Sequence, residues 1–270
     1  MAAHGASVVV NDAGVAADGT QPSTSPADHV AADIVRAGGE AVASHDDVVS
    51  GARAIIATAL DAFGRVDAVV NNAGILRSGL LLRTTPADWR AVFDVHLIGT
   101  LGITQAAAEH WRAETKAGRK PDASVVNTSS TAGLFGFVGE PAYSAAKAGV
   151  VGFTLTAAAE LARYGVRVNA IAPAAATRLT AWAGDQPGMA PELVAPLVVW
   201  LCAPASAGVT GRVFEVGAGV VTLVEGWRRA VAIPHDASTA LARLGQMVSE
   251  ALPRLSEPVP ASIPVAEATT

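Results

Sequence analysis

The chain has 270 residues, 51% of them hydrophobic and 16% charged, and it carries a formal net charge of −5. This length is enough for one large domain with a substantial core, and the negative charge offers no basic stripe for nucleic acid. The single cysteine, Cys202, excludes a disulfide framework and suits a reducing compartment. We find no signal peptide and no apolar run of membrane-spanning length, so we expect a cytoplasmic protein that binds neither nucleic acid nor membrane.

Short runs of β-branched residues alternate along the chain with longer alanine-rich stretches. The strand candidates are 7–11, 41–44, 66–71, 123–128, 166–171 and 212–216, and the helix candidates are 27–37, 50–63, 86–117, 142–164 and 190–202. This alternation predicts an α/β fold with a parallel sheet covered by helices on both faces. From about residue 236 the composition turns to Ala, Pro and Ser, so we expect one domain over 1–235 and a loose tail over 236–270.

The stretch YSAAKAG places Tyr143 and Lys147 four residues apart within a predicted helix. On a helix this spacing puts both side chains on one face. A tyrosine hydroxyl has a pKa of about 10, so acid–base work near neutral pH requires its anion to be stabilised, which a nearby ammonium does. The spacing therefore indicates proton transfer, although a surface Tyr and Lys would give the same pattern.

Two further stretches follow predicted strands. In NTSSTAG the strand ends at Ser129 and Ser130, at the edge where parallel sheets bind ligands. In NNAG, residues 71–74, a glycine after a buried strand lets the backbone approach a ligand closely. The alternative for NTSSTAG is an ordinary cluster of serines at a strand end, and NNAG alone is typical of a turn.

With these motifs the chain resembles the short-chain dehydrogenase/reductase family over residues 1 to about 235, and RVNAIAP at 167–173 adds to the likeness. The resemblance implies a Rossmann-like doubly wound sheet and hydride transfer carried out by a nicotinamide cofactor. It implies that Tyr143 transfers the proton, that Ser130 orients the substrate oxygen, and that Lys147 binds the nicotinamide ribose and lowers the pKa of Tyr143. The cofactor-binding residues it implies are Asp12, Asp46, Asp47, Asn71, Ala73, Gly74, Tyr143, Lys147, Ala175, Ala176, Thr177 and Arg178.

The choice between NAD and NADP depends on Asp12, which follows the first predicted strand. A carboxylate there can accept hydrogen bonds from the adenosine ribose hydroxyls and would repel a 2′-phosphate. No Arg or Lys lies near Asp12 in the sequence, so we expect NAD. Asp12 in NDAG is also a good turn residue, and the resemblance leaves open whether Asp46 or Asp47 contacts the adenine.

A narrower likeness is to the (3R)-hydroxyacyl-CoA dehydrogenase part of peroxisomal multifunctional enzymes and its bacterial relatives, carried by NNAGILR, AYSAAKAG, APAAATR, APLVVWLC and FEVGAG. His96 stands in VHLIG where most of the broad family carries Asn. We count it with Ser130, Tyr143 and Lys147 as a candidate catalytic residue, able to bond a backbone carbonyl or relay water, although a core histidine is equally expected. No two histidines have metal-ligand spacing, and we expect no metal.

Nothing in the chain matches Gly-x-x-x-Gly-x-Gly after a strand. We therefore expect a sheet that lacks the family's usual first strand and the glycine-rich loop that holds the diphosphate. The strands at 7–11 and 66–71 would lose their ladder partners, and NAD would bind weakly.

Three functions stay open. The first is an NAD-dependent oxidoreductase acting on a CH–OH group, including a 3-hydroxyacyl-CoA of fatty acid metabolism. The second is a 3-oxoacyl-acyl-carrier-protein reductase using NADPH, and the third is a non-catalytic remnant that acts only by association. The resemblance also implies a homodimer or homotetramer paired through the helices at 86–117 and 142–164.

Overall fold

The structure is a computed structural model, and it describes residues 1–20, 26–177, 179–180, 188–226, 231–234 and 241–252. Its strands form two sheets. The first holds two parallel strands, β1 (Ser7–Asn11) and β2 (Glu40–Ser44). The second has the order β3-β4-β5-β6-β7 and is parallel apart from its last pair: β3 (Ala68–Asn71), β4 (Ala123–Thr128), β5 (Val166–Pro173), β6 (Val213–Gly217) and β7 (Val220–Val224).

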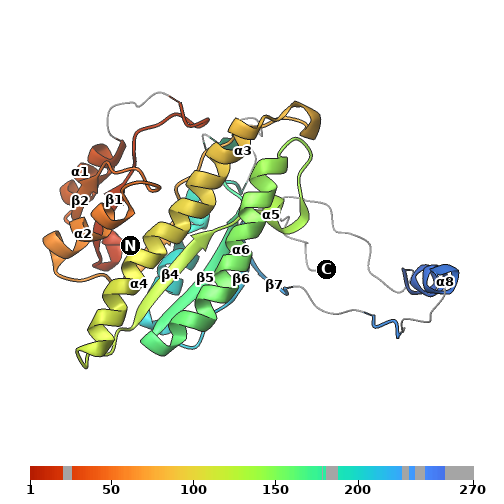
Figure 1. Cartoon of the computed structure of the whole chain (residues 1–270). Coiled ribbons are helices and arrows are strands. Elements are labelled where there is room, and N and C mark those ends of the chain that lie inside the picture. The colour runs from red at the N-terminus through yellow and green to blue at the C-terminus, as the bar shows by residue number, and fades with distance from the viewer. Residues whose placement is uncertain (21–25, 178, 181–187, 227–230, 235–240, 253–270) are drawn as a thin grey trace.

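Helices connect the strands in the expected alternation, and α4 and α6 lie across the front of β4 and β5 (Figure 1). The α-helices are α1 (Pro26–Arg36), α2 (Ala52–Phe63), α3 (Pro86–Phe93), α4 (Thr100–Lys116), α5 (Thr131–Phe135), α6 (Pro141–Leu161), α7 (Ala195–Cys202) and α8 (Leu241–Ala251). A π-helical segment, η3 (Asp94–Gly99), joins α3 to α4, and short 3-10 turns occur at Ala2–His4, Leu81–Arg83, Ala162–Tyr164, Pro191–Leu193 and Pro204–Ser206.

The expected α/β class with a parallel central sheet is confirmed. The strands expected at 7–11 and 123–128 have those bounds, and all of β4 is buried. The expected gap is also present, because β1 and β3 belong to different sheets in the described part of the chain. The single helix expected over 86–117 is instead three segments, since the π-helical turn widens its middle.

The C-terminal part contains two elements that the sequence analysis did not predict. The hairpin of β6 and β7 continues the sheet past residue 217, where no further strand was expected. Within the region expected to be a loose tail, Leu241–Ala251 form the helix α8. Leu244, Val248 and Ala251 repeat at helical spacing there, which explains the helix. Residues 253–270 lie outside the described residues.

Two helical stretches, Pro86–Lys116 and Pro141–Tyr164, reach the length and apolar composition of a membrane span, with mean hydropathies of 1.3 and 1.2. We had expected no such run. Both stretches pack on the sheet: α4 buries Ile103 and Trp111, and α6 buries Ala146 and Val150. Packing of a core helix explains their apolar composition.

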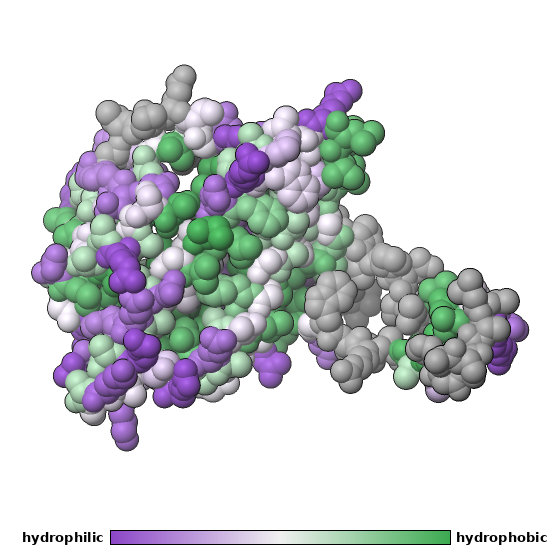
Figure 2. All heavy atoms as spheres, in the orientation of Figure 1, coloured by the Kyte–Doolittle hydropathy of each residue, from purple (hydrophilic) through white to green (hydrophobic). Residues whose placement is uncertain are grey.

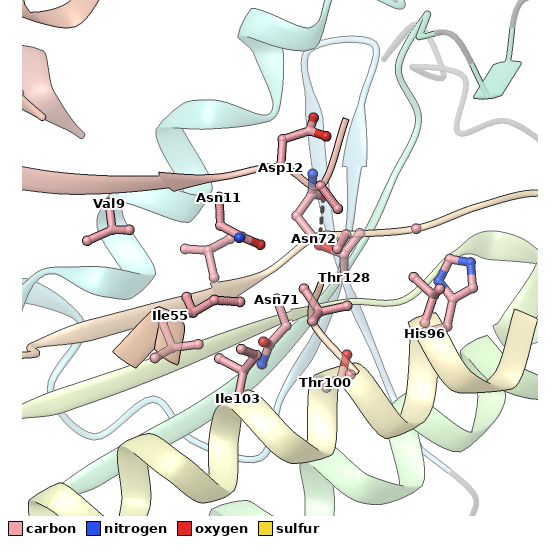
Figure 3. Close-up of a pocket in the computed structure, with 18 of the residues that line it drawn as sticks. Val9, Asn11, Asp12, Ile55, Asn71, Asn72, His96, Thr100, Ile103 and Thr128 are labelled. Carbon is pink, nitrogen blue, oxygen red and sulfur yellow. Dashed lines mark hydrogen bonds between the residues drawn. The ribbon is translucent and has the colours of Figure 1, made fainter. Parts of the chain in front are cut away.

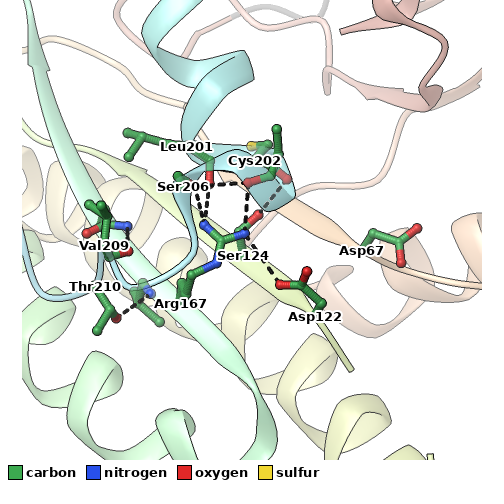
Figure 4. A network of polar contacts seen from close by, with 12 residues as sticks. Asp67, Asp122, Ser124, Arg167, Leu201, Cys202, Ser206, Val209 and Thr210 are labelled. Carbon is green, nitrogen blue, oxygen red and sulfur yellow. Dashed lines mark hydrogen bonds and ion pairs between the residues drawn. The ribbon is translucent and has the colours of Figure 1, made fainter. Parts of the chain in front are cut away.

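Arg167 of β5 ties the end of α7 to the sheet (Figure 4). Its side chain is buried and donates from Nη1 to the Leu201 carbonyl at 2.9 Å and to the Ser206 hydroxyl. Nη2 donates to the Ala203 carbonyl at 3.3 Å and lies 3.7 Å from a carboxylate oxygen of Asp122. The last carbonyls of a helix have no partner within the helix, so this guanidinium satisfies them from outside.

Candidate active site

A cavity of about 880 Å³ extends along the gap between β1 and β3 and reaches the carboxyl ends of β3, β4 and β5 (Figure 3). It brings together most of the residues that the sequence singled out. Those that line it are Asp12, Asp47, Asn71, Ala73, Gly74, His96, Ser130, Tyr143, Lys147, Ala175 and Thr177. Asp46 and Ala176 are not among the lining residues, and Arg178 lies outside the described residues.

Tyr143 and Lys147 lie in the first turns of α6, where Pro141 opens the helix. Lys147 is 3% exposed, and its Nζ lies 5.6 Å from the centre of the Tyr143 ring. The same Nζ donates to the carbonyl oxygen of Thr128, at the end of β4, at 2.6 Å. The helix therefore presents a phenol and an amine on one face, as the spacing predicted, and the amine is fixed against the sheet.

Ser130 is held close to this pair by the short helix α5. Its hydroxyl caps that helix by accepting from the Ala132 amide at 3.2 Å. Next to it, the Ser129 hydroxyl donates to the Lys147 carbonyl at 2.9 Å. Gly133 makes the contact between the two helices possible, since a Cβ there would lie 2.6 Å from the Lys147 backbone. Ser129 therefore connects the end of β4 to α6, and Ser130 begins α5.

His96 comes from η3 and is 1% exposed. Its Nε2 lies 2.7 Å from the Ile75 carbonyl oxygen and 3.2 Å from the Ile75 amide nitrogen. Its ring meets that of Tyr143 edge-on, with 5.1 Å between the ring centres. Nδ1 is buried without a hydrogen-bond partner in the described part of the chain. The backbone-carbonyl contact is the first of the two roles that the sequence left open.

The asparagines of NNAG have different partners. Asn71 donates to Thr104 of α4 at 3.0 Å and to Asn127 of β4 at 2.8 Å, and Asn127 donates to Thr154 of α6 at 2.9 Å. This buried chain of amides and hydroxyls joins two strands to the two helices in front of them. Asn72 accepts from the Thr128 hydroxyl at 3.0 Å, which fixes the rim of the cavity.

The three carboxylates expected to contact the adenosine part of the cofactor differ in whether they line the cavity. Asp12 lines the cavity and also forms a turn, because its Oδ1 accepts from the Gly14 amide at 2.7 Å. Asp47 lines the cavity and accepts from the Val49 amide at 2.9 Å. Asp46 instead accepts from the Ser44 hydroxyl at 3.0 Å. Of the two carboxylates left open by the sequence, Asp47 is therefore the one on the cavity.

A family model described as short chain dehydrogenase matches residues 3–186. The chain belongs to the short-chain dehydrogenase/reductase family. A short chain dehydrogenase of Mycobacterium avium, known as a crystal structure, is 46% identical with a TM-score of 0.88, over 96% of this chain and 90% of that one. As a member of this family the chain is an oxidoreductase.

Two relatives of this dehydrogenase/reductase carry more specific names. Peroxisomal multifunctional enzyme type 2 of Mus musculus is 42% identical over 234 residues, which are 86% of this chain and 31% of the relative. A 3-oxoacyl-[acyl-carrier-protein] reductase of Synechocystis is 42% identical over 234 residues, 82% of this chain and 89% of the relative. The chain thus spans about a third of the multifunctional enzyme's length.

Burial sets the charge state of this dehydrogenase/reductase site. It lowers the pKa of Lys147 to about 7 and raises the pKa of Tyr143 to about 12. Interaction with the Ser130 hydroxyl lowers the pKa of Tyr143, and the charge of Glu140 raises it. The net shift of the Tyr143 pKa is therefore upward, whereas the resemblance implied a lowered value, because desolvation of the phenol is the largest effect.

Glu140 is a site residue that the sequence analysis missed. It precedes Pro141 at the start of α6, and burial raises the pKa of its carboxyl group. Its position three residues before Tyr143 was the available signal, since residues three apart on a helix share a face. The same analysis missed Thr128, whose part in the site is a backbone carbonyl that any residue type would supply.

The site residues fit a nicotinamide dinucleotide at both of its riboses. Asp12 follows β1 and lines the cavity, and the buried Lys147 and Tyr143 line the same cavity. No glycine-rich loop of the family's pattern occurs in the sequence to hold the diphosphate between them. In the described residues no three His, Cys, Asp or Glu side chains are grouped to hold a metal ion.

Proposed function

We propose that the chain is an NAD-dependent oxidoreductase that interconverts a secondary alcohol and a ketone in a 3-hydroxyacyl thioester. The observation that carries the proposal is the single cavity lined by Ser130, Tyr143, Lys147 and Asp12. The same cavity thus holds a proton donor, Tyr143, and a carboxylate that suits ribose hydroxyls, Asp12. Bound nicotinamide would supply the hydride acceptor or donor.

Tyr143 is the proposed proton donor and acceptor. With a pKa of about 12 the phenol is protonated at neutral pH, so in the reducing direction it can give its proton to the substrate oxygen as that oxygen gains charge. The Ser130 hydroxyl donates to the same oxygen and orients it. The Lys147 amine, with a pKa of about 7, is partly charged at neutral pH and stabilises the phenolate that remains. In the oxidising direction the phenolate takes the proton back.

Support for the thioester substrate comes from two sources. The sequence motifs resemble the hydroxyacyl-CoA dehydrogenase part of multifunctional enzymes, and a hydroxyacyl-CoA dehydrogenase of Mycobacterium tuberculosis is 42% identical over 237 residues. The same likeness is the basis for proposing a role in fatty acid metabolism. The cytoplasmic location that we propose rests instead on the single cysteine, which suits a reducing compartment.

A second candidate function is reduction of a 3-oxoacyl carrier-protein thioester with NADPH. The Synechocystis relative supports it. Asp12 argues against it, because a carboxylate repels a 2′-phosphate and the sequence has no Arg or Lys before Arg36 to offset that repulsion.

The test is absorbance of the reduced nicotinamide with acetoacetyl-CoA as substrate. Consumption of NADH supports the first function, consumption of NADPH alone supports the second, and silence with both supports a non-catalytic role. Tyr143→Phe removes the proton donor and should abolish turnover. Tyr164→Phe changes the only other tyrosine and is the matched control, since Tyr164 packs on Arg163. Turnover that persists in Tyr143→Phe would contradict the mechanism.

We also infer that the protein is a homodimer or homotetramer paired through α4 and α6. Apolar residues lie exposed on these helices and on η3, and Figure 2 shows apolar surface on this face. They are Ile98, Leu101 and Leu155, each more than two-fifths exposed. Contiguous apolar surface of this kind is typical of interfaces. Light scattering after size-exclusion chromatography tests the inference, and Leu101→Glu should shift the protein to monomer.

A further inference from the structure

Two loops beside the candidate active site lie next to each other. The Gly79 amide donates to the Gly139 carbonyl at 2.7 Å, which joins the segment before α3 to the loop between α5 and α6. The first of these loops continues the chain from Ile75, and the second leads into α6 toward Tyr143. Ile75 and Tyr143 pack in one apolar cluster, and both line the cavity. Each loop therefore leaves the cavity close to the proposed proton donor.

The side chains on these two loops are apolar and exposed. We call five of them the outer apolar surface, and each is two-fifths or more exposed: Leu80, Leu81, Leu82, Phe137 and Val138. Leu82, at 98%, and Val138, at 86%, are the most exposed large hydrophobic side chains in the described part of the chain. Figure 2 shows apolar surface at the upper right of the domain, where the loop between α5 and α6 lies in Figure 1. A contiguous apolar patch of a few hundred Å² on a protein surface is often functional.

The leucines of the outer apolar surface are not what shapes their loop. The Arg83 amide donates to the Leu80 carbonyl at 2.7 Å, and the Thr84 hydroxyl donates to the Leu81 carbonyl at 3.2 Å. These bonds, with the one between the two glycines, hold the turn through its main chain. The three leucine side chains project outward from a backbone that is already fixed, so they can serve a ligand without cost to the fold.

The composition of the two loops indicates what kind of ligand they suit. No charged residue occurs at 78–82 or 136–139, so a ligand that covers them is apolar along that part, as a hydrocarbon chain is. The patch of a few hundred Å² is also smaller than the roughly 800 Å² that each partner of a standard protein interface buries. A hydrocarbon chain that extends outward from the cavity therefore suits this surface better than a protein partner does.

We propose that the outer apolar surface binds the distal part of the acyl chain in a 3-hydroxyacyl or 3-oxoacyl thioester whose 3-oxygen lies at Tyr143. This inference rests on the proposed function and narrows its substrates to thioesters with acyl chains longer than that of acetoacetyl-CoA. Burial of one methylene group favours binding by about fourfold, and burial of half its area favours binding by about twofold. A chain that lies on this open surface should gain the smaller factor for each methylene group.

The experiment compares acetoacetyl-CoA with 3-oxooctanoyl-CoA, whose acyl chain is longer by four methylene groups. Kd for each thioester is measured by calorimetry with NAD present, which cannot reduce it, and kcat/KM is measured with NADH. The unmodified protein should bind 3-oxooctanoyl-CoA about tenfold more tightly and reduce it with a kcat/KM about tenfold higher. Equal Kd values for the two thioesters would overturn the proposal.

A double variant, Leu82→Asn/Val138→Asn, tests where the chain binds. Both side chains are almost fully exposed, so these substitutions leave the core intact. The ratio of the two Kd values should fall by about threefold or more. Val221→Asn/Leu223→Asn makes the same two changes on exposed positions of β7 and should leave the ratio unchanged. An equal fall of the ratio in both double variants would overturn the proposal.

Failure of this proposal is distinguishable from failure of the proposed function. If neither thioester is reduced but the difference in Kd is present and depends on Leu82 and Val138, the proposed oxidoreductase function fails and the acyl-binding surface stands. Reduction of both thioesters with equal Kd values would leave the function standing and overturn the surface. Light scattering covers the remaining occupant: a smaller oligomer in Leu82→Asn/Val138→Asn, with an unchanged Kd ratio, would identify a contact between copies and overturn the proposal.

Discussion

The imidazole of His96 occupies the space that a side chain at position 74 would need. A Cβ on Gly74 would lie 2.5 Å from His96 Cε1, and the ring is fixed by its contact with the Ile75 carbonyl. The glycine of NNAG is therefore required by a histidine from another segment of the chain.

Gly74→Ala should push the His96 ring away from its position and lower the free energy of unfolding by about 1–3 kcal/mol, the usual penalty for overpacking a core. Denaturation in urea measures the change. Gly152→Ala on α6 is the control, because a Cβ at that position meets nothing within 4 Å. Equal stability of Gly74→Ala and the unmodified protein would show that the ring moves freely.

His96 should make the protein sensitive to acid. Burial, with a smaller effect from the charge of Lys147, lowers its pKa from 6.5 to about 3. The unfolded chain then binds a proton below pH 6.5 that the folded chain does not, so the contribution to stability is lost as the pH falls from about 6.5 toward 3. Melting temperatures of the unmodified protein and of His96→Asn, measured across this range, should converge as the pH falls. A constant difference would contradict the lowered pKa.

Lys147 should make the stability of the protein depend on pH in the alkaline range. Its pKa falls from 10.5 to about 7 on folding, so the unfolded chain binds more protons between these values and stability rises with pH across the interval. Relative to Lys147→Met, the unmodified protein should gain up to about 1.4 kcal/mol per pH unit between pH 7 and 10. Lys116→Met changes an exposed lysine and should show no such slope. A flat difference for Lys147→Met would mean that the buried amine stays charged.

Arg167→Met should lower the free energy of unfolding by about 2–3 kcal/mol, because it leaves the buried carbonyls at the end of α7 without their charged donor. Thermal and urea denaturation give the change. Arg112→Met on the exposed side of α4 should stay within about 0.5 kcal/mol of the unmodified protein. A small effect of Arg167→Met would mean that water replaces the guanidinium.

The sequence was informative where burial gives a continuous pattern. β4 and β5 are buried along almost their whole length, and their valines marked them as strands in the sequence. The spacing of Tyr143 and Lys147 predicted a shared face because helix geometry is local. The hairpin of β6 and β7 had a sequence signal that went unused, the stretch Gly217-Ala218-Gly219. Glycine favours the positive φ that a tight two-residue turn requires, and Ala218 and Gly219 both adopt it.

Other features of the site could not be predicted from the sequence, because they depend on contacts between distant segments. The direction in which the pKa of Tyr143 shifts depends on how deeply the phenol is buried, and residue spacing alone does not predict that burial. The choice of Asp47 over Asp46 follows from which carboxylate faces the cavity. The roles of NNAG are divided between Asn71, which bonds inside the core, and Gly74, which makes room for a ring.

The π-helical turn at Asp94–Gly99 constrains how many residues can join α3 to α4. It lies between His96, which points inward at Ile75, and Thr104, which receives the Asn71 amide. Because a π-helical turn holds one residue more than an α-helical turn, deleting one residue there would close it to an α-helical turn and change the direction of the side chains within it, His96 among them. Length in this segment is constrained as tightly as residue identity, and a variant shortened by one position would be more damaging than most substitutions within it.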